Sequence, residues 1–385
     1  MDKPLLVANW NYPTCVRVGP GRINELAAAC KELGMSAPLL VTDPGLARST
    51  MVEKAVTSCQ AADLNVAVFS AIKANPTGAN VTDGVKSYHQ GGHDGVIAFG
   101  GGSALDAAKA IALMVGQELP LWDFEDVGDN WSRVNIVGMA PVVAVPTTAG
   151  TGSEVGRASV ITDTDKQIKK IIFHPQMLPA IVILDPELTF GLPKALTAAT
   201  GMDALSHCLE AYCATYYHPM AEGIAMQGMK LIKNNLLCAY HDGNDIEART
   251  HMLVASAMGA TAFQRGLGAM HALAHPLGAL YDAHHGRLNA ILMPYVLQAN
   301  RLVITEKIER LADYLSVPNG FDGFIDWLLQ LRMELGIENT LTSLGVVKSD
   351  VERIAKMATE DAASGSNPIL FNQDEYKNIL LSALE

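Results

Sequence analysis

The stretch GVIAFGGGSALDAAKAIALMV, residues 95–115, decides the fold of the first half of the chain. It reads as a short apolar strand, a run of glycines and then a series of good helix formers. Gly100, Gly101 and Gly102 let the backbone approach an anion closely, and Ser103 can cap a helix whose free N–H groups and dipole favour a phosphate. A tight strand-to-helix turn without a ligand is the alternative. The motif does not decide between the two, because it matches neither common phosphate-loop pattern.

Similar short apolar runs lie on both sides of this stretch. Strands are predicted at 14–18, 38–43, 65–70, 95–100, 141–146 and 180–185, and a helix at 22–33. Lengths that fit crossover helices separate the second, third and fourth runs, and continuous apolar runs suit a parallel sheet covered on both faces. From Pro193 onward, segments rich in alanine, leucine and methionine have helical spacing. We therefore expect an α/β domain at 1–192 and an all-helical domain at 193–385.

A second polar turn follows the predicted strand at 141–146. Its sequence, PTTAGTGSEV, places Thr147, Thr148, Thr151 and Ser153 with two glycines at the carboxyl end of that strand. Ligands bind at this end of the strands in open α/β sheets, and hydroxyls and exposed amides suit a nucleotide. Loop chemistry alone also explains a turn rich in threonine and glycine. Together, the two turns favour nucleotide binding.

The helical half carries candidate metal ligands. In GMDALSHCLEAY, Asp203 and His207 are four residues apart and share one face if the segment is helical. The stretch GAMHALAHPLGALYDAHHG, residues 268–286, holds four of the 11 histidines of the chain, namely His271, His275, His284 and His285. A single histidine there is more often a hydrogen-bonded core residue. One carboxylate and three imidazoles without cysteine could together bind Fe(II), Zn(II) or a similar divalent ion.

Length and composition exclude several other classes of protein. A chain of 385 residues exceeds the usual size of a single core, and it has no run of about 18 apolar residues. The start lacks a signal-peptide profile, and six cysteines without a C-x-x-C pair fit reduced thiols, so we expect a cytoplasmic protein. A net charge of −12 gives no basic surface for nucleic acid. Small molecules and further copies of the chain are the expected partners.

The chain resembles the iron-containing alcohol dehydrogenases, the family that includes lactaldehyde reductase and 1,3-propanediol dehydrogenase. Four segments carry the resemblance nearly end to end: GGGSALDAAKAIA, PTTAGTGSEV, LTAATGMDALSHCLEAY and GAMHALAHPLGALYDAHHG. The resemblance implies a dehydroquinate synthase-like architecture, with an α/β nucleotide-binding domain, an all-α metal-binding domain and NAD in the cleft between them. We also expect a homodimer or a higher homo-oligomer.

Individual residues inherit roles from this resemblance. The implied metal ligands are Asp203, His207, His271 and His285, and His275 lies beside the substrate and the nicotinamide, where it relays a proton. The implied coenzyme residues are Gly101, Gly102, Ser103 and Asp106 at the pyrophosphate, Thr147, Thr148 and Thr151 on the nicotinamide side, Lys169 on the nucleotide side and Asp43 at the adenosine ribose. Two departures stand out. The chain reads AHHG where many relatives read PHG, which makes His284 a further candidate ligand or pocket residue, and it lacks the arginine that follows NP in many relatives.

The sequence therefore predicts a metal-dependent, NAD-linked alcohol dehydrogenase or aldehyde reductase for a small primary alcohol or diol. Asp43 favours NAD, because the 2′-phosphate of NADP would bring about two negative charges against the carboxylate. Alternatively, Asp43 only opens the turn at Pro44 and Gly45. Two other functions stay open: a metal- and NAD-dependent lyase of the dehydroquinate synthase type, and a non-catalytic filament or interaction protein. The latter would require lost ligands, and this chain keeps all four.

Overall fold

The structure, a computed structural model, describes residues 8–10 and 14–385. The chain divides into two compact units. The first holds the chain up to Thr148 together with Gly152–Gly191, and the second holds Ala149–Thr151 and Leu192–Glu385. The three residues Ala149–Thr151 lie in the second threonine-rich turn, so that turn contributes to both units. Among the described helices, none is long and apolar enough to cross a membrane.

The first unit contains a seven-stranded sheet in the order β1-β2-β9-β6-β5-β3-β4. Its strands are β1 (Ala8–Trp10), β2 (Cys15–Val18), β3 (Pro38–Val41), β4 (Ala67–Phe69), β5 (Gly95–Gly100), β6 (Val142–Pro146) and β9 (Ile181–Leu184). All pairings are parallel except that of β1 with β2. Every residue of β3, β5, β6 and β9 is buried, as continuous apolar strands in a covered parallel sheet require. The predicted parallel sheet is confirmed.

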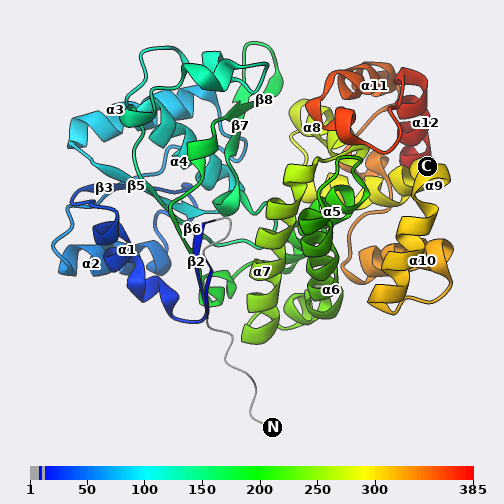
Figure 1. Cartoon of the computed structure of the whole chain (residues 1–385), viewed down its shortest axis with the longest axis horizontal. Helices are drawn as coiled ribbons and strands as arrows, with labels where there is room; N and C mark the ends of the chain where they lie inside the picture. The colour runs from blue at the N-terminus through cyan, green and yellow to red at the C-terminus, as the bar shows by residue number, and fades with distance from the viewer. Residues whose placement is uncertain (1–7, 11–13) are drawn as a thin grey trace, which may run out of the picture. The chain divides into compact units, whose positions relative to one another are not determined.

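Helices cover both faces of this sheet. The crossover helices are α2 (Thr50–Ala61), α3 (Gly78–Gly91) and α4 (Gly102–Met114), and α1 (Leu26–Glu32) follows β2. Figure 1 shows α1 and α2 on one face and α3 and α4 on the other. The helix predicted at 22–33 is α-helical only from Leu26, because its first turn is the 3-10 turn η1 (Arg22–Glu25). Gly21, at φ 71°, precedes that turn in a backbone conformation that glycine favours.

A separate two-stranded sheet was not predicted. It pairs β7 (Ala158–Asp163) antiparallel with β8 (Ile168–Phe173). Buried and half-buried residues alternate along β7, as in a strand with one face on the core. Its buried positions hold Ser159, Ile161 and Asp163, so the sequence of β7 has no apolar alternation, and it also lacks the continuous apolar run of the main-sheet strands.

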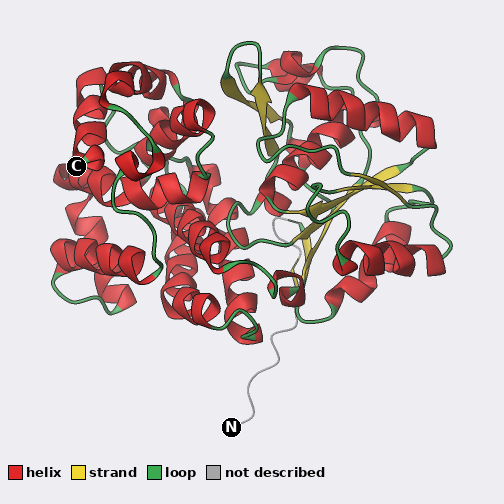
Figure 2. Ribbon diagram, turned by 180° about the vertical axis from the view of Figure 1, so that it is seen from behind, coloured by secondary structure: helices red, strands yellow, loops and turns green. Residues whose placement is uncertain are grey.

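The second unit is helical, and Figure 2 shows strands only in the first unit. Its helices are α5 (Lys194–Cys213), α6 (Pro219–His241), α7 (Ile246–Ala262), α8 (Ala269–Tyr281), α9 (His285–Leu315), α10 (Gly320–Glu334), α11 (Val351–Glu360) and α12 (Gln373–Leu384). Helix α5 is buried from Thr197 to Cys213 and contacts α6, α7 and α9. Because it is enclosed on all sides, its polar side chains must find partners inside the unit.

Candidate active site

Helix α5 supplies two of the expected metal ligands. Asp203 and His207 are 3% and 6% exposed, and the Nε2 atom of His207 lies 3.9 Å from the Oδ1 atom of Asp203. Their spacing of four residues places them on one face of the helix, as the sequence predicted. A buried carboxylate beside a buried imidazole needs a further polar partner or a cation.

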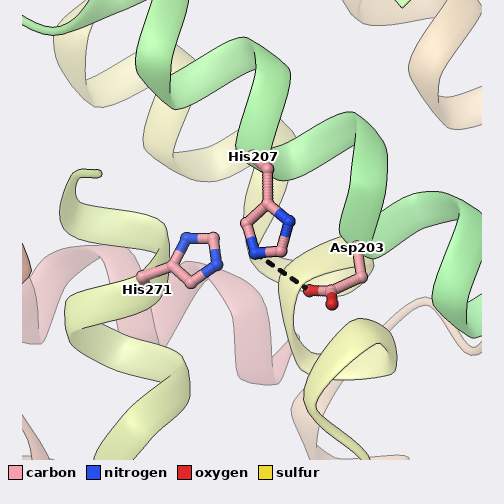
Figure 3. A group of neighbouring side chains, drawn as sticks. All are labelled: Asp203, His207 and His271. Carbon is pink, nitrogen blue, oxygen red and sulfur yellow. Dashed lines mark ion pairs between the residues drawn. The ribbon is translucent and has the colours of Figure 1, made fainter. Parts of the chain in front are cut away.

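Helix α8 brings a second imidazole to the same point. The ring of His271 stacks on that of His207, with centroids 4.9 Å apart and planes at 20°. One ligand atom from each of Asp203, His207 and His271 lies within 4.8 Å of the others, and Figure 3 shows the two rings and the carboxylate converging. Helix α8 continues through Pro276 to Tyr281, so the proline does not end it.

The first residue of α9, His285, adds a fourth candidate metal ligand. The Nε2 atom of His285 lies 3.7 Å from Asp203 Oδ1, and its ring centroid is 5.1 Å from that of His271. The next residue, Gly286, packs directly on α5, where a Cβ atom would meet the carbonyl oxygen of Ala199 at 2.0 Å. A glycine is therefore required for α9 to approach this closely. His284 is the residue before α9, and its side chain does not cap the helix.

The electrostatics of the cluster suit a cation. Burial lowers the pKa of His207 to about 4, so its imidazole is neutral near pH 7 and keeps a free lone pair. Burial also acts to lower the pKa of His271, but the Glu210 carboxylate reverses the direction and raises it. Ligand atoms at about 2.0–2.2 Å from a tetrahedral ion lie roughly 3.3–3.6 Å apart. The observed separations from Asp203 Oδ1, 3.7 and 3.9 Å, fit such an ion after a small contraction.

Asn289 points into the cluster and was missed at the sequence level. It lies on α9 four residues after His285 and is fully buried. Its Nδ2 atom donates to Asp203 Oδ1 at 2.9 Å and lies 3.3 and 3.2 Å from the Nε2 atoms of His271 and His285. Within the part of the chain that the structure describes, its Oδ1 atom has no hydrogen-bond partner. The helical spacing from His285 was an available signal.

His275 lies one turn after His271 on α8. Its Nδ1 atom is 2.8 Å from Asp361 Oδ2, and its ring stacks on that of His285 at 5.6 Å and 12°. The carboxylate can only accept, so Nδ1 carries the proton and Nε2 is the nitrogen that can take up or release another one. Asp361 was not predicted, because 86 residues separate it from His275.

The glycine turn of the first unit gives helix α4 no side-chain cap from its own N-cap residue. Gly100 has φ 143°, and a Cβ atom there would meet Ala104 Cβ at 2.9 Å. Gly101 is the N-cap of α4 and makes no side-chain cap. The expectation that Ser103 caps this helix is wrong. The helix begins at Gly102, so Ser103 is already inside the first turn, and its hydroxyl donates to the carbonyl oxygen of Ala74.

The second turn lies beside the first. The N–H of Thr147 donates to the Gly100 carbonyl at 2.9 Å, and a Cβ atom on Gly101 would lie 3.5 Å from Thr148. Asp106 ties α4 to this region, since it accepts from Ser153 Oγ at 2.5 Å and from the Val160 N–H at 3.0 Å. Lys169 lies apart from the main sheet, on β8 opposite Thr162, and Thr151 belongs to the helical unit.

Asp43 has contacts that fit both of its predicted roles. Its Oδ1 atom accepts from the N–H groups of Gly45 and Leu46 at 2.8 and 3.0 Å, which is the turn-opening role. Its Oδ2 atom lies 3.5 Å from where a Cβ atom on Gly100 would be, beside the glycine turn. One carboxylate oxygen therefore holds the local turn, while the other faces the candidate pyrophosphate loop.

Comparisons with known proteins cover both units. Residues 13–186 match the profile described as iron-containing alcohol dehydrogenase, and residues 197–384 match that of the C-terminal domain of the Fe-containing alcohol dehydrogenase family. The chain is 38% identical to a 4-hydroxybutyrate dehydrogenase from Cupriavidus necator, over 96% of this chain and 98% of that protein.

Solved structures with the same fold include two informative ones. A crystal structure of 1,3-propanediol oxidoreductase superposes with a TM-score of 0.91 at 35% identity, covering 99% of this chain and all of the other. A sulfoacetaldehyde reductase from Bifidobacterium kashiwanohense, solved in complex with NAD+, gives a TM-score of 0.88 at 25% identity and covers 99% of each chain.

Proposed function

The chain belongs to the iron-containing alcohol dehydrogenase family and is an oxidoreductase, and from this premise we propose that it transfers a hydride between a small primary alcohol or diol and NAD at a divalent metal. The observation that carries the proposal is the convergence of Asp203, His207, His271 and His285 from α5, α8 and α9. Fe(II) is the proposed native ion and Zn(II) the second choice, because both accept oxygen and nitrogen ligands without cysteine.

The protein residues would hold the ion in place. Three imidazoles and one carboxylate would bind the cation, and the neutral state of His207 leaves a lone pair for it. When bound, the cation supplies Lewis acidity to the oxygen of the alcohol or carbonyl.

On the coenzyme side, we propose that the start of α4 holds the pyrophosphate. Its N-cap residue Gly101 offers no side-chain cap, and the dipole of a 13-residue helix favours an anion there. Gly102 and Ser103 are the first two residues of that helix, and Asp106 fixes its position. Thr147, Thr148 and Thr151 would serve the nicotinamide side, Lys169 the nucleotide and Asp43 the ribose. NAD, when bound, supplies the hydride acceptor.

His275 is the proposed proton carrier. Asp361 holds its Nδ1–H, which leaves Nε2 to take the hydroxyl proton during oxidation and return it during reduction. A lyase reaction of the dehydroquinate synthase type is disfavoured, because the chain matches dehydrogenase profiles over both units.

Formation of reduced coenzyme tests this function. The purified, metal-loaded protein should reduce NAD with at least one member of a panel of small primary alcohols and diols. It should not do so after removal of the metal with a chelator, and Fe(II) should restore the rate. Turnover that is insensitive to metal removal would refute the proposal.

We further propose a cytoplasmic homo-oligomer. All six cysteines are free, and Cys30 and Cys59 are fully buried, as in proteins of reducing compartments. The segment 127–137 exposes several large apolar side chains, of which Val137 is 95% exposed, and such a patch favours association. Sedimentation of the purified protein should give a mass at least twice that of one chain.

A further inference from the structure

Glu210 occupies a position that the proposed chemistry does not use. It lies on α5 three residues after His207, and it is only 6% exposed. Its carboxylate makes three short hydrogen bonds. Oε2 accepts from His271 Nδ1 at 2.6 Å and from the Gly268 N–H at 2.8 Å, while Oε1 accepts from the Met270 N–H at 2.7 Å.

These bonds compensate the burial of the charge. The backbone N–H groups of Gly268 and Met270 stand at the start of α8, where the dipole of the helix favours an anion. Helix α8 has no side-chain cap from its own N-cap residue, so a carboxylate from α5 takes that place. A Cβ atom on Gly268 would lie 2.8 Å from Glu210 Oε1, which shows how closely the backbone approaches the carboxylate.

The bond to His271 selects one tautomer of its ring. A carboxylate accepts and cannot donate, so the proton must lie on Nδ1. The lone pair then belongs to Nε2, the nitrogen that lies 3.3 Å from Asn289 Nδ2 on the side of the ligand cluster. In the other tautomer, an Nε2–H group would point at that cluster and the Nδ1 lone pair would face a negative charge.

We infer that Glu210 is a positioning residue of the metal site, which prepares His271 as a ligand by fixing its tautomer and by holding the start of α8. The inference rests on the proposed metal-binding function. Carboxylates bonded to the distal nitrogen of a ligating histidine fix the ring and raise its basicity, and their loss typically weakens metal affinity about 10- to 100-fold.

Asn367 provides a matched control at the same helix start. It is 3% exposed, and its Oδ1 atom accepts from the Ala269 N–H at 3.0 Å, but none of its hydrogen bonds among the described residues involves His271. Asn367→Ala therefore weakens the capping of α8 without touching the imidazole. A purely structural role of Glu210 predicts the same loss of metal affinity in both variants.

The experiment is a Co(II) titration of metal-stripped wild type, Glu210→Gln and Asn367→Ala against a competing chelator, followed by the visible spectrum of the bound ion. We expect the Kd for Co(II) of Glu210→Gln to rise at least tenfold with an altered spectrum, while Asn367→Ala stays within about threefold of wild type despite a lower Tm. Equal Kd values in wild type and Glu210→Gln, or equal losses in the two variants, would overturn the inference. Failure of wild type to bind Co(II) would instead refute the metal site itself.

A measurement on the wild type keeps the inference testable if Glu210→Gln does not fold. Nitrogen-15 NMR of histidine-labelled, Zn(II)-loaded protein reports which ring nitrogen carries the proton, and sequential assignment identifies the signals of His271. Protonated Nδ1 with metal on Nε2 supports the inference, and metal on Nδ1 contradicts it.

Discussion

His275 and Asp361 are joined by the hydrogen bond from Nδ1 to Oδ2, so both belong to the proposed proton transfer. His275→Ala should keep its metal while kcat falls about 10²- to 10⁴-fold, because it removes the general acid–base group. The kcat of Asp361→Asn should fall less than that of His275→Ala. The amide can still accept from Nδ1–H, but it stabilises a charged imidazole less than the carboxylate does. Turnover across a pH series checks both variants, together with elemental analysis. An unchanged pH profile with metal retained would reduce His275 to a packing residue.

Asp43 should determine the choice of coenzyme. We expect the wild type to have a higher kcat/KM with NAD than with NADP, and Asp43→Gly to lose this preference mainly by improved use of NADP. Asp43→Asn is the sharper variant, since an amide oxygen can still accept from Gly45 and Leu46 and keep the turn. If the wild type uses both coenzymes equally, or if Asp43→Asn keeps its preference, the carboxylate only opens the turn.

The residues that the sequence predicted and those that it missed differ in how their contacts arise. Asp203 and His207 share a helix, so spacing alone places them together. The bonds of Glu210 to His271 and of Asp361 to His275 join positions 61 and 86 residues apart. No local pattern encodes these contacts, because they arise when separate helices pack. Asn289 is an intermediate example. Its place on a helix can be predicted from the sequence, but its contact with Asp203 on another helix cannot.

At the scale of elements, the approach of α9 to α5 depends on Gly286. Gly286→Ala should cost metal affinity and activity, because its Cβ atom would meet the backbone oxygen of Ala199 and displace His285 from Asp203. Gly223→Ala on α6 is the matched control, since a Cβ atom there meets nothing within 4 Å. The control should gain up to about 1 kcal/mol of stability from helix propensity. Chemical denaturation and metal analysis check both, and full metal content in Gly286→Ala would show that the contact is dispensable.

Helices and strands were predicted correctly where a single sequence pattern, such as a continuous apolar run, determined the element. The buried strands of the main sheet are continuous apolar runs, and these were found. Strand β7 was not predicted because its buried positions hold Ser159, Ile161 and Asp163 and give no apolar pattern. The first turn of the helix predicted at 22–33 is a 3-10 turn. Ser103 was predicted as a cap because serine favours that position. The helix instead begins at Gly102, before Ser103, because Gly101 adopts the extended conformation of the N-cap.

At the scale of the whole molecule, the pH dependence of stability should carry the signature of Glu154. Burial raises the pKa of Glu154 from 4.5 to about 7, and within the described residues its Oε1 atom has no hydrogen-bond partner. Between these values the unfolded chain has released the proton that the folded chain retains. Stability should therefore fall as the pH rises from about 4.5 to 7, by on the order of 3 kcal/mol, and then level off.

Glu154→Gln removes this dependence, because an amide does not ionise. Unfolding by urea at pH 5 and pH 8 should show a smaller difference in the free energy of unfolding for the variant than for wild type. The exposed Glu118→Gln serves as the control and should behave as wild type. The same pH dependence in Glu154→Gln and wild type would assign it to other groups.

The two-unit organisation agrees with the change in composition and periodicity after Pro193, the residue that precedes α5. The sheet of the first unit requires β-branched apolar runs, whereas the helices of the second require apolar residues with a period of 3.6. These two sequence patterns therefore distinguish the two units. Composition could not assign Ala149–Thr151 to the helical unit. That grouping depends on the close contact of Gly150 with Thr200, where a Cβ atom would lie 2.7 Å from the threonine Cβ atom.

The most direct test of the metal-centred account is the metal content of His271→Ala and His285→Ala, measured with the turnover of the same samples. Both variants should lose most of their bound metal and their ability to reduce NAD, while the exposed His241→Ala keeps both. Full metal content with ordinary turnover in either ligand variant would contradict the account, and His275 or His284 would then have to replace the lost ligand.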